Sequence, residues 1–180
     1  MLGDDLMINN KRDYKYYLEQ DRLQLGRSLK KPKPLTDPIW HFQLLLRKYE
    51  YISNTSNNKL LKNLYKLRFR KMSIKLGFSI PINVFGPGLA IVHYGNIIIN
   101  PDCHIGKNCR IHVGVNIGGD PHQVPQLGDN CYLGPGAKLY GPISIGDNTK
   151  IGAGAVVNKS FPEGNCTLAG VPAVNKTKAN

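Results

Sequence analysis

The chain has 180 residues, 41% of them hydrophobic, with a formal net charge of +12 at pH 7, which is long enough for one domain with a core plus a helical extension. Its longest purely aliphatic runs, such as residues 44–46, are far too short for a transmembrane span, and its first residues lack the apolar segment of a secretory signal, so we expect a soluble, cytoplasmic protein. The positive charge would suit nucleic acid, but outside one stretch the Lys and Arg residues are scattered, and no nucleic-acid-binding motif is present.

The first 79 residues are predicted to form a helical region. Helices are expected over residues 13–26, 38–51 and 58–75. Asp37 is a candidate N-cap with Pro38 in the first helical position, and Gly77 is a typical stop signal after the third helix. We expect these helices to cover the open end of the domain that follows.

Residues 59–75 form a strongly basic stretch, with seven Lys or Arg residues and no acid. If this stretch is helical, five apolar residues are expected to pack against the rest of the protein: Leu60, Leu61, Leu64, Leu67 and Met72. The basic side chains are then left for solvent or for a partner. Two interpretations stay open, a solvated face that keeps the protein soluble and peripheral contact with an anionic membrane surface.

An aliphatic residue recurs every six positions over the second half of the chain, with one interruption. The series consists of Ile105, Ile111, Ile117, Leu127, Leu133, Leu139, Ile145, Ile151 and Val157. Glycine directly follows six of these residues. A period of six matches neither an α-helix nor an ordinary strand and is typical of a parallel β-helix, in which three hexapeptides make one triangular coil. The predicted fold is therefore mainly β, with a parallel β-helix over residues 80–170, the α-helical region before it and a short tail over 171–180.

The interruption between Ile117 and Leu127 spans ten residues, which is one hexapeptide plus four. Residues 118–126 are therefore expected to leave the β-helix as a loop, and loops on rigid scaffolds often carry function.

A narrow inward position of the repeat, which takes small side chains, is predicted to hold Cys103, Cys109 and Cys131. Buried cysteines of this kind act as small hydrophobic residues, which argues against a disulfide scaffold or a metal site. Cys166 lies outside the repeat as read from the sequence, and no role is assigned to it.

From about residue 80 onward the sequence resembles the serine acetyltransferase branch of the hexapeptide acyltransferases. The similarity is carried by residues 86–99, 115–130, 150–157 and 169–173. Residues 13–23 and 37–48 look like a subgroup linked to surface-polysaccharide synthesis. The resemblance implies a left-handed β-helix, a homotrimer, an active site between neighbouring coils, acetyl-CoA as co-substrate and no metal.

Two histidines match the family's active-site histidines. His93 lies where the family has its catalytic base, and His122, in the loop, matches the second active-site histidine. A hydroxyl is a weak nucleophile until a base takes its proton, and histidine titrates near neutral pH. Stepping back by sixes from Ile105 leads to His93, so we expect His93 to replace an inward aliphatic residue. The other histidines, His41, His104 and His112, are expected in surface or packing roles.

The resemblance also suggests binding residues. Sugar-acetyltransferase members of the family suggest contacts with CoA near Pro135, Ala153, Asn158 and Lys159. Asp120, in the loop, is a candidate contact for the acceptor.

Three departures from the serine enzymes bear on the acceptor. Val92 and Pro121 stand where those enzymes have an Asp and an Arg next to the two histidines, and Phe78 aligns near the Asp that orients the catalytic base. Because Val92 and Pro121 offer no charges for the ends of an amino acid, we expect a neutral acceptor, such as a sugar hydroxyl of a surface glycan. The alternatives are a serine O-acetyltransferase of cysteine biosynthesis and a non-catalytic β-helix that binds acyl-CoA or a partner protein.

Overall fold

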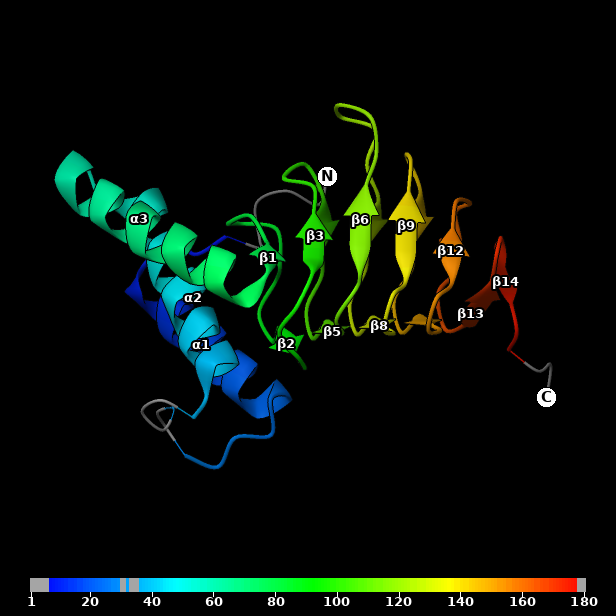
Figure 1. Ribbon diagram of the computed structural model, residues 1–180, viewed down its shortest axis with the longest axis horizontal. Coiled ribbons are helices and arrows are strands. Elements are labelled where there is room, and N and C mark those ends of the chain that lie inside the picture. The colour runs from blue at the N-terminus through cyan, green and yellow to red at the C-terminus, as the bar shows by residue number, and fades with distance from the viewer. Residues whose placement is uncertain (1–6, 30–31, 33–35, 178–180) are drawn as a thin grey trace.

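The computed structural model describes residues 7–29, 32 and 36–177, so parts of the predicted regions 1–79 and 171–180 lie outside the described residues. Three helices at the N-terminal end adjoin an elongated stack of short strands (Figure 1). No helix in the described part of the chain is long and apolar enough to cross a membrane.

The three predicted helices are confirmed. They are α1 (Lys11–Gln24), α2 (Pro38–Thr55) and α3 (Lys59–Leu76). The side chain of Asn58 caps the start of α3, and Gly77 ends that helix with a left-handed φ of 77°, which glycine adopts without strain. Asp37 stands at the N-cap position of α2 but makes no capping hydrogen bond with its side chain. Its carboxylate instead pairs with Arg27, at 2.8 Å.

The strands form the three faces of a parallel β-helix. The β6 face stacks β1 (Phe78–Ser79), β3 (Ile97–Ile99), β6 (Asn116–Gly118), β9 (Lys138–Tyr140) and β12 (Val156–Val157). The β7 face stacks β4 (His104–Ile105), β7 (Gln126–Leu127) and β10 (Ser144–Ile145). The β8 face stacks β2 (Ala90–Ile91), β5 (Arg110–Ile111), β8 (Tyr132–Leu133), β11 (Lys150–Ile151), β13 (Thr167–Gly170) and β14 (Ala173–Asn175). The pairing is parallel apart from the final pair, β13 and β14, which is antiparallel. The predicted fold class, a left-handed parallel β-helix with a helical extension, is confirmed.

The chain turns from the β8 face to the β6 face at a first corner, from the β6 face to the β7 face at a second corner, and from the β7 face back to the β8 face at a third. At the third corner four asparagines have left-handed backbone, with φ between 48° and 57°: Asn108, Asn130, Asn148 and Asn165. Each of the first three donates a side-chain hydrogen bond of 3.0 Å to the next asparagine along the stack. Asparagine tolerates this conformation better than most residues, so the ladder fixes the shape of the corner.

The interior of the coils is the hydrophobic core. All nine aliphatic residues of the six-residue series are buried, as are Cys103, Cys109 and Cys131. Cys166 is buried too, and pairing of β11 with β13 places it beside Thr149 in the same inward column, so it belongs to the repeat. Burial raises the pKa of Cys103 and of Cys131 to about 11, which keeps both thiols protonated at neutral pH.

The expectation that His93 points inward is wrong. β2 pairs with β5 so that Ile91 lies opposite Ile111, and Ile91 takes the inward position with 1% of its surface exposed. In the next coil, the corresponding inward residues Ile111 and Ile117 are six residues apart. Their partners in the first coil, Ile91 and Ile99, are eight residues apart. The extra length enlarges the first corner and leaves His93 exposed on its outside.

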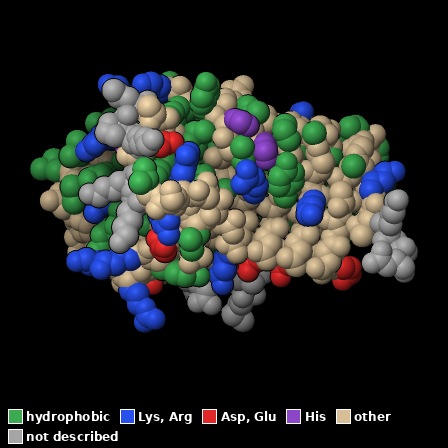
Figure 2. All heavy atoms as spheres, turned by 90° about the horizontal axis from the view of Figure 1, so that it is seen from below, with side chains coloured by type: hydrophobic (Ala, Val, Ile, Leu, Met, Phe, Trp, Pro, Cys, Tyr) green, Lys and Arg blue, Asp and Glu red, His purple; other side chains and the backbone are tan. Residues whose placement is uncertain are grey.

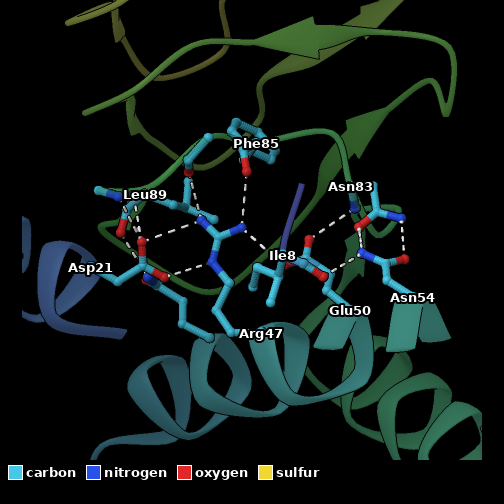
Figure 3. A network of polar contacts seen from close by, with 11 residues as sticks. Ile8, Asp21, Arg47, Glu50, Asn54, Asn83, Phe85 and Leu89 are labelled. Carbon is cyan, nitrogen blue, oxygen red and sulfur yellow. Dashed lines mark hydrogen bonds and ion pairs between the residues drawn. The ribbon is translucent and has the colours of Figure 1, made fainter. Parts of the chain in front are cut away.

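A buried ionic cluster joins the helices to the first coil (Figure 3). The Arg47 guanidinium on α2 pairs with Asp21 of α1 at 2.8 Å and with Glu50 at 3.0 Å. It also donates to the carbonyl oxygens of Phe85 and Gly86 in the first coil. Asp21 in turn accepts hydrogen bonds from the backbone N–H groups of residues 88 and 89. Both helices are thus tied to the backbone of one coil.

The face of α3 that packs against the protein differs from the predicted one. The Phe69 ring stacks on Phe42 and contacts Tyr49, both of α2, and Met72 packs against the core. Leu60, Leu64 and Leu67, which were expected to pack inward, are 82%, 51% and 66% exposed. A helix places these leucines on the side opposite Phe69, and no described element covers that side.

Candidate functional site

His93 lies at the first corner beside a second histidine, His112. Their ring centroids are 6.1 Å apart, and the His112 ring lies 5.1 Å from that of Tyr132 in the next coil. Figure 2, which views the β-helix from below, shows two neighbouring histidine side chains close to Lys and Arg side chains. The corner therefore presents a row of ring side chains along the stack.

The environment of His112 keeps its ring neutral. Burial lowers the pKa of His112, and the positive charge of Arg110 and the interaction with the neighbouring His93 lower it further. Its Nε2 atom is buried and has no hydrogen-bond partner among the described residues. A neutral imidazole with an unused nitrogen thus adjoins the exposed His93.

His112 was expected in a surface or packing role, but its ring lies next to His93, the predicted base. The sequence feature that could have identified His112 as a site residue is its position in the repeat. His112 directly follows the inward Ile111, at the place that glycine takes after six of the other inward residues.

Two of the four predicted cofactor contacts share the corner of His93. Pro135 and Ala153 are exposed further along the first corner, and their segments are joined by a hydrogen bond from the Gly154 N–H to the Pro135 carbonyl, 2.8 Å long.

The loop over residues 118–126 leaves the β-helix at the second corner (Figure 1). His122 stands at its tip with its side chain 89% exposed and its Nδ1 atom 3.2 Å from a carboxylate oxygen of Asp102. The Tyr140 hydroxyl donates to the Asp120 carboxylate at 3.3 Å. A side chain at residue 119 would lie 2.0 Å from the Gln123 carbonyl oxygen, so glycine is required for the loop to close on itself.

Asn158 and Lys159 also lie at the second corner, exposed after β12. The predicted residues therefore divide into two sets at opposite edges of the β6 face. His93 lies before β3, whereas Asp102, the partner of His122, lies after it. Between the two edges the β6 face has a shallow depression of about 440 Å³, lined by Ile98, Asn116, Lys138 and Tyr140 among others. One protomer brings His93 to His112 and His122 to Asp102, but it does not bring His93 to His122.

The β7 face has a larger hollow of about 570 Å³, which contains none of the predicted site residues. Asp129 and Asp147 lie there, but each uses a carboxylate oxygen to accept a backbone N–H of the preceding coil at 2.7 Å. These carboxylates hold adjacent coils in register.

No carboxylate in the described part of the chain pairs with His93. Phe78, which aligns near the family's orienting acid, is buried with its ring 4.8 Å from that of Phe42. Of the residues that the structure describes, none hydrogen-bonds to the His93 ring, and His112 is its nearest ring neighbour.

Comparisons with known proteins identify the repeat. A family model described as bacterial transferase hexapeptide (six repeats) matches residues 125–159. A serine acetyltransferase of Synechococcus elongatus is 40% identical over 91 residues, which is 48% of this chain and 37% of that protein. A serine acetyltransferase of Staphylococcus epidermidis is 34% identical over 124 residues, or 64% of this chain and 58% of that protein. The chain thus spans only part of the length of these relatives.

Solved structures resemble the chain over most of its length. A serine acetyltransferase from Brucella abortus superimposes with a TM-score of 0.73 at 25% identity, covering 92% of this chain and 69% of that one. A serine acetyltransferase in complex with CoA gives a TM-score of 0.72 at 25% identity, with 92% and 70% covered. The predicted polysaccharide subgroup finds no support in these relatives. The chain carries the transferase hexapeptide repeat and is similar in sequence and fold to serine acetyltransferases.

Proposed function

We propose that this protein is an acetyl-CoA-dependent O-acetyltransferase in which His93 is the general base. The observation that carries the proposal is the exposed His93 at a corner of a transferase hexapeptide β-helix. His93 takes the proton of the acceptor hydroxyl, and the oxygen attacks the thioester carbonyl of acetyl-CoA. The C–S bond breaks, and the CoA thiolate receives the proton from the imidazolium. His112, whose ring lies beside that of His93, is proposed as a positioning residue that limits the orientations of the His93 ring by packing.

The active form is proposed to be a homotrimer. A single protomer holds His93 and His122 at opposite edges of the β6 face, so a site that uses both needs the second corner of one copy to meet the first corner of the next. The same arrangement joins Pro135 and Ala153 of one copy to Asn158 and Lys159 of another, as a groove for CoA. The Lys159 ammonium is suited to a CoA phosphate as a point charge. Because acetyl-CoA is a cytoplasmic metabolite, the reaction is assigned to the cytoplasm.

Serine is the first acceptor to test, because the relatives are named serine acetyltransferases. The acceptor predicted first, a sugar hydroxyl, is kept as a second candidate on one observation. Val92 and Pro121, beside the two histidines, carry no charge for the ammonium and carboxylate of an amino acid. Asp120, held by Tyr140, is the charged loop residue nearest His122 in sequence and is proposed to contact either acceptor.

The experiment is continuous measurement of free thiol release from acetyl-CoA by the purified full chain. Serine is compared with homoserine, free sugars and nucleotide sugars, and the acetylated products are identified by mass spectrometry. Thiol release that depends on serine supports serine as the acceptor, and release that depends on a sugar supports a sugar hydroxyl as the acceptor. No release above acetyl-CoA hydrolysis with any of these acceptors would overturn the enzymatic proposal.

A further inference from the structure

The uncovered face of α3 carries an apolar stripe. Leu60, Leu64, Leu67 and Ile74 are 82%, 51%, 66% and 72% exposed. They recur at i, i+4, i+7 and i+14, so they lie on one side of the helix. The opposite side, with Phe69, packs on α2. α3 therefore has two apolar sides, of which the fold of one chain uses one.

The position of α3 leaves this stripe accessible in the chain. α2 packs between α1 and α3, so α3 is the edge helix of the helical layer (Figure 1). The N-terminal end of α3 extends away from the β-helix. None of the described helices or strands lies over the stripe.

Positive charge borders the stripe on both sides. At 3.6 residues per turn, Lys59 and Arg70 flank it on one side, Arg68 and Lys75 flank it on the other, and Lys71 lies within it. All five are exposed. Since α3 contains no Asp or Glu, no carboxylate of its own neutralises these charges.

The Lys and Arg residues around the apolar stripe distinguish between three possible binding partners of α3. A second copy of α3 would place Lys and Arg beside Lys and Arg and would bury Lys71, which like-charge repulsion and desolvation both oppose. A nucleic acid would pair with the charges but would leave the leucines in water. An anionic bilayer accepts both, because apolar side chains enter the acyl boundary while Lys and Arg extend along them to the headgroups.

We propose that α3 is an interfacial helix that binds the surface of an anionic membrane through the apolar stripe and its flanking Lys and Arg residues. The sequence alone suggested only an attraction between charges. The exposed leucines add a reason for the helix to enter the interface, and they make binding depend on apolar contact as well as on salt. This surface does not depend on the proposed acetyl transfer.

The test is co-sedimentation of the full chain with vesicles of phosphatidylcholine alone or mixed with phosphatidylglycerol, at low and at physiological salt. We expect binding to the mixed vesicles only, weakened by salt. The variant Leu64→Gln/Leu67→Gln keeps every charge and is expected to lower the partition coefficient by about tenfold or more. The variant Arg68→Gln/Lys75→Gln is expected to lower it by a similar factor.

Matched controls lie on α1, where Leu23 is 54% exposed and Lys11 and Lys15 are exposed. Leu23→Gln and Lys11→Gln/Lys15→Gln change the same chemistry elsewhere and should leave vesicle binding within about twofold of the wild type. Equal binding to both vesicle types, no binding at low salt, or unchanged binding of Leu64→Gln/Leu67→Gln would overturn the proposal. Sedimentation velocity completes the test, because dissociation of the wild-type assembly by Leu64→Gln/Leu67→Gln would assign the stripe to a second copy instead.

Discussion

At the scale of single residues, His93 occupies an enlarged corner outside the core, where its ring is free to meet a substrate. Replacement of His93 by Gln keeps a polar side chain but removes the base. We expect acetyl transfer to fall by about 10²–10⁴-fold with little change in stability. The matched control is His104→Gln, an exposed histidine on the β7 face, which should keep wild-type activity. Comparable loss in both variants would argue against a special role for His93.

His112 predicts a dependence of stability on pH. Its pKa in the folded protein lies below its ordinary value, so the unfolded chain binds the proton first as pH falls. The stability that neutral His112 contributes is therefore present above the ordinary histidine pKa and is lost as pH falls through the lowered one. The variant His112→Gln cannot titrate. We expect the difference in Tm between about pH 7.5 and about pH 5 to be smaller in His112→Gln than in the wild type. An equal or larger difference would contradict this assignment, and a change in the pH profile of acetyl transfer would further identify His112 as a positioning residue.

At the scale of elements, the buried Asp21–Arg47–Glu50 cluster fixes α1 and α2 on the first coil (Figure 3). The variant Asp21→Ala leaves the buried Arg47 with one carboxylate and removes the acceptor of two backbone N–H groups. We expect a loss of about 3–5 kcal/mol in the free energy of unfolding, measured by urea denaturation. The exposed Glu19, also on α1, pairs with Arg22, and Glu19→Ala should cost no more than about 1 kcal/mol. Similar costs in the two variants would show that the cluster contributes little.

The asparagine ladder at the third corner combines a backbone effect with a side-chain effect. Asn130 has a φ of 57° and hydrogen-bonds to an asparagine on each side. Asn130→Ala loses the side-chain hydrogen bonds and also places a residue that disfavours left-handed backbone at this position. We expect it to lower the free energy of unfolding by about 2–3 kcal/mol. Asn130→Gly keeps the left-handed backbone at low cost, so it should lose only the hydrogen-bond part, about 1 kcal/mol. Denaturation of the two variants separates the effects, and equal destabilisation would show that backbone conformation is not the cause.

At the scale of the whole molecule, the separation of His93 from His122 makes the proposed assembly testable by mixing. The variants His93→Ala and His122→Ala are each expected to be nearly inactive. If each site takes one histidine from each of two copies, unfolding and refolding an equal mixture restores about a quarter of the sites by random assortment. Activity should then return to about that fraction of the wild type in the thiol assay. No recovery, with trimers present by sedimentation, would place both histidines of a site in one copy.

The sequence by itself determined the β-helix and the three helices. A six-residue period admits one architecture, and it placed the aliphatic residues and three cysteines correctly in the core because each coil repeats the same inward positions. Asn58, Pro38 and Gly77 marked helix ends through local backbone chemistry that needs no distant partner. The loop over residues 118–126 followed from simple counting.

The tertiary structure decided the register and the neighbours. The enlarged corner moved His93 out of the inward series, because strand pairing, rather than counting back by sixes, sets which residue faces the core. Pairing between coils brought His112 to His93 and added Cys166 to the core column. Packing on α2 decided which apolar side of α3 is buried, since the helix offers two. Each of these features depends on contacts between residues far apart in the chain, which local sequence patterns do not specify.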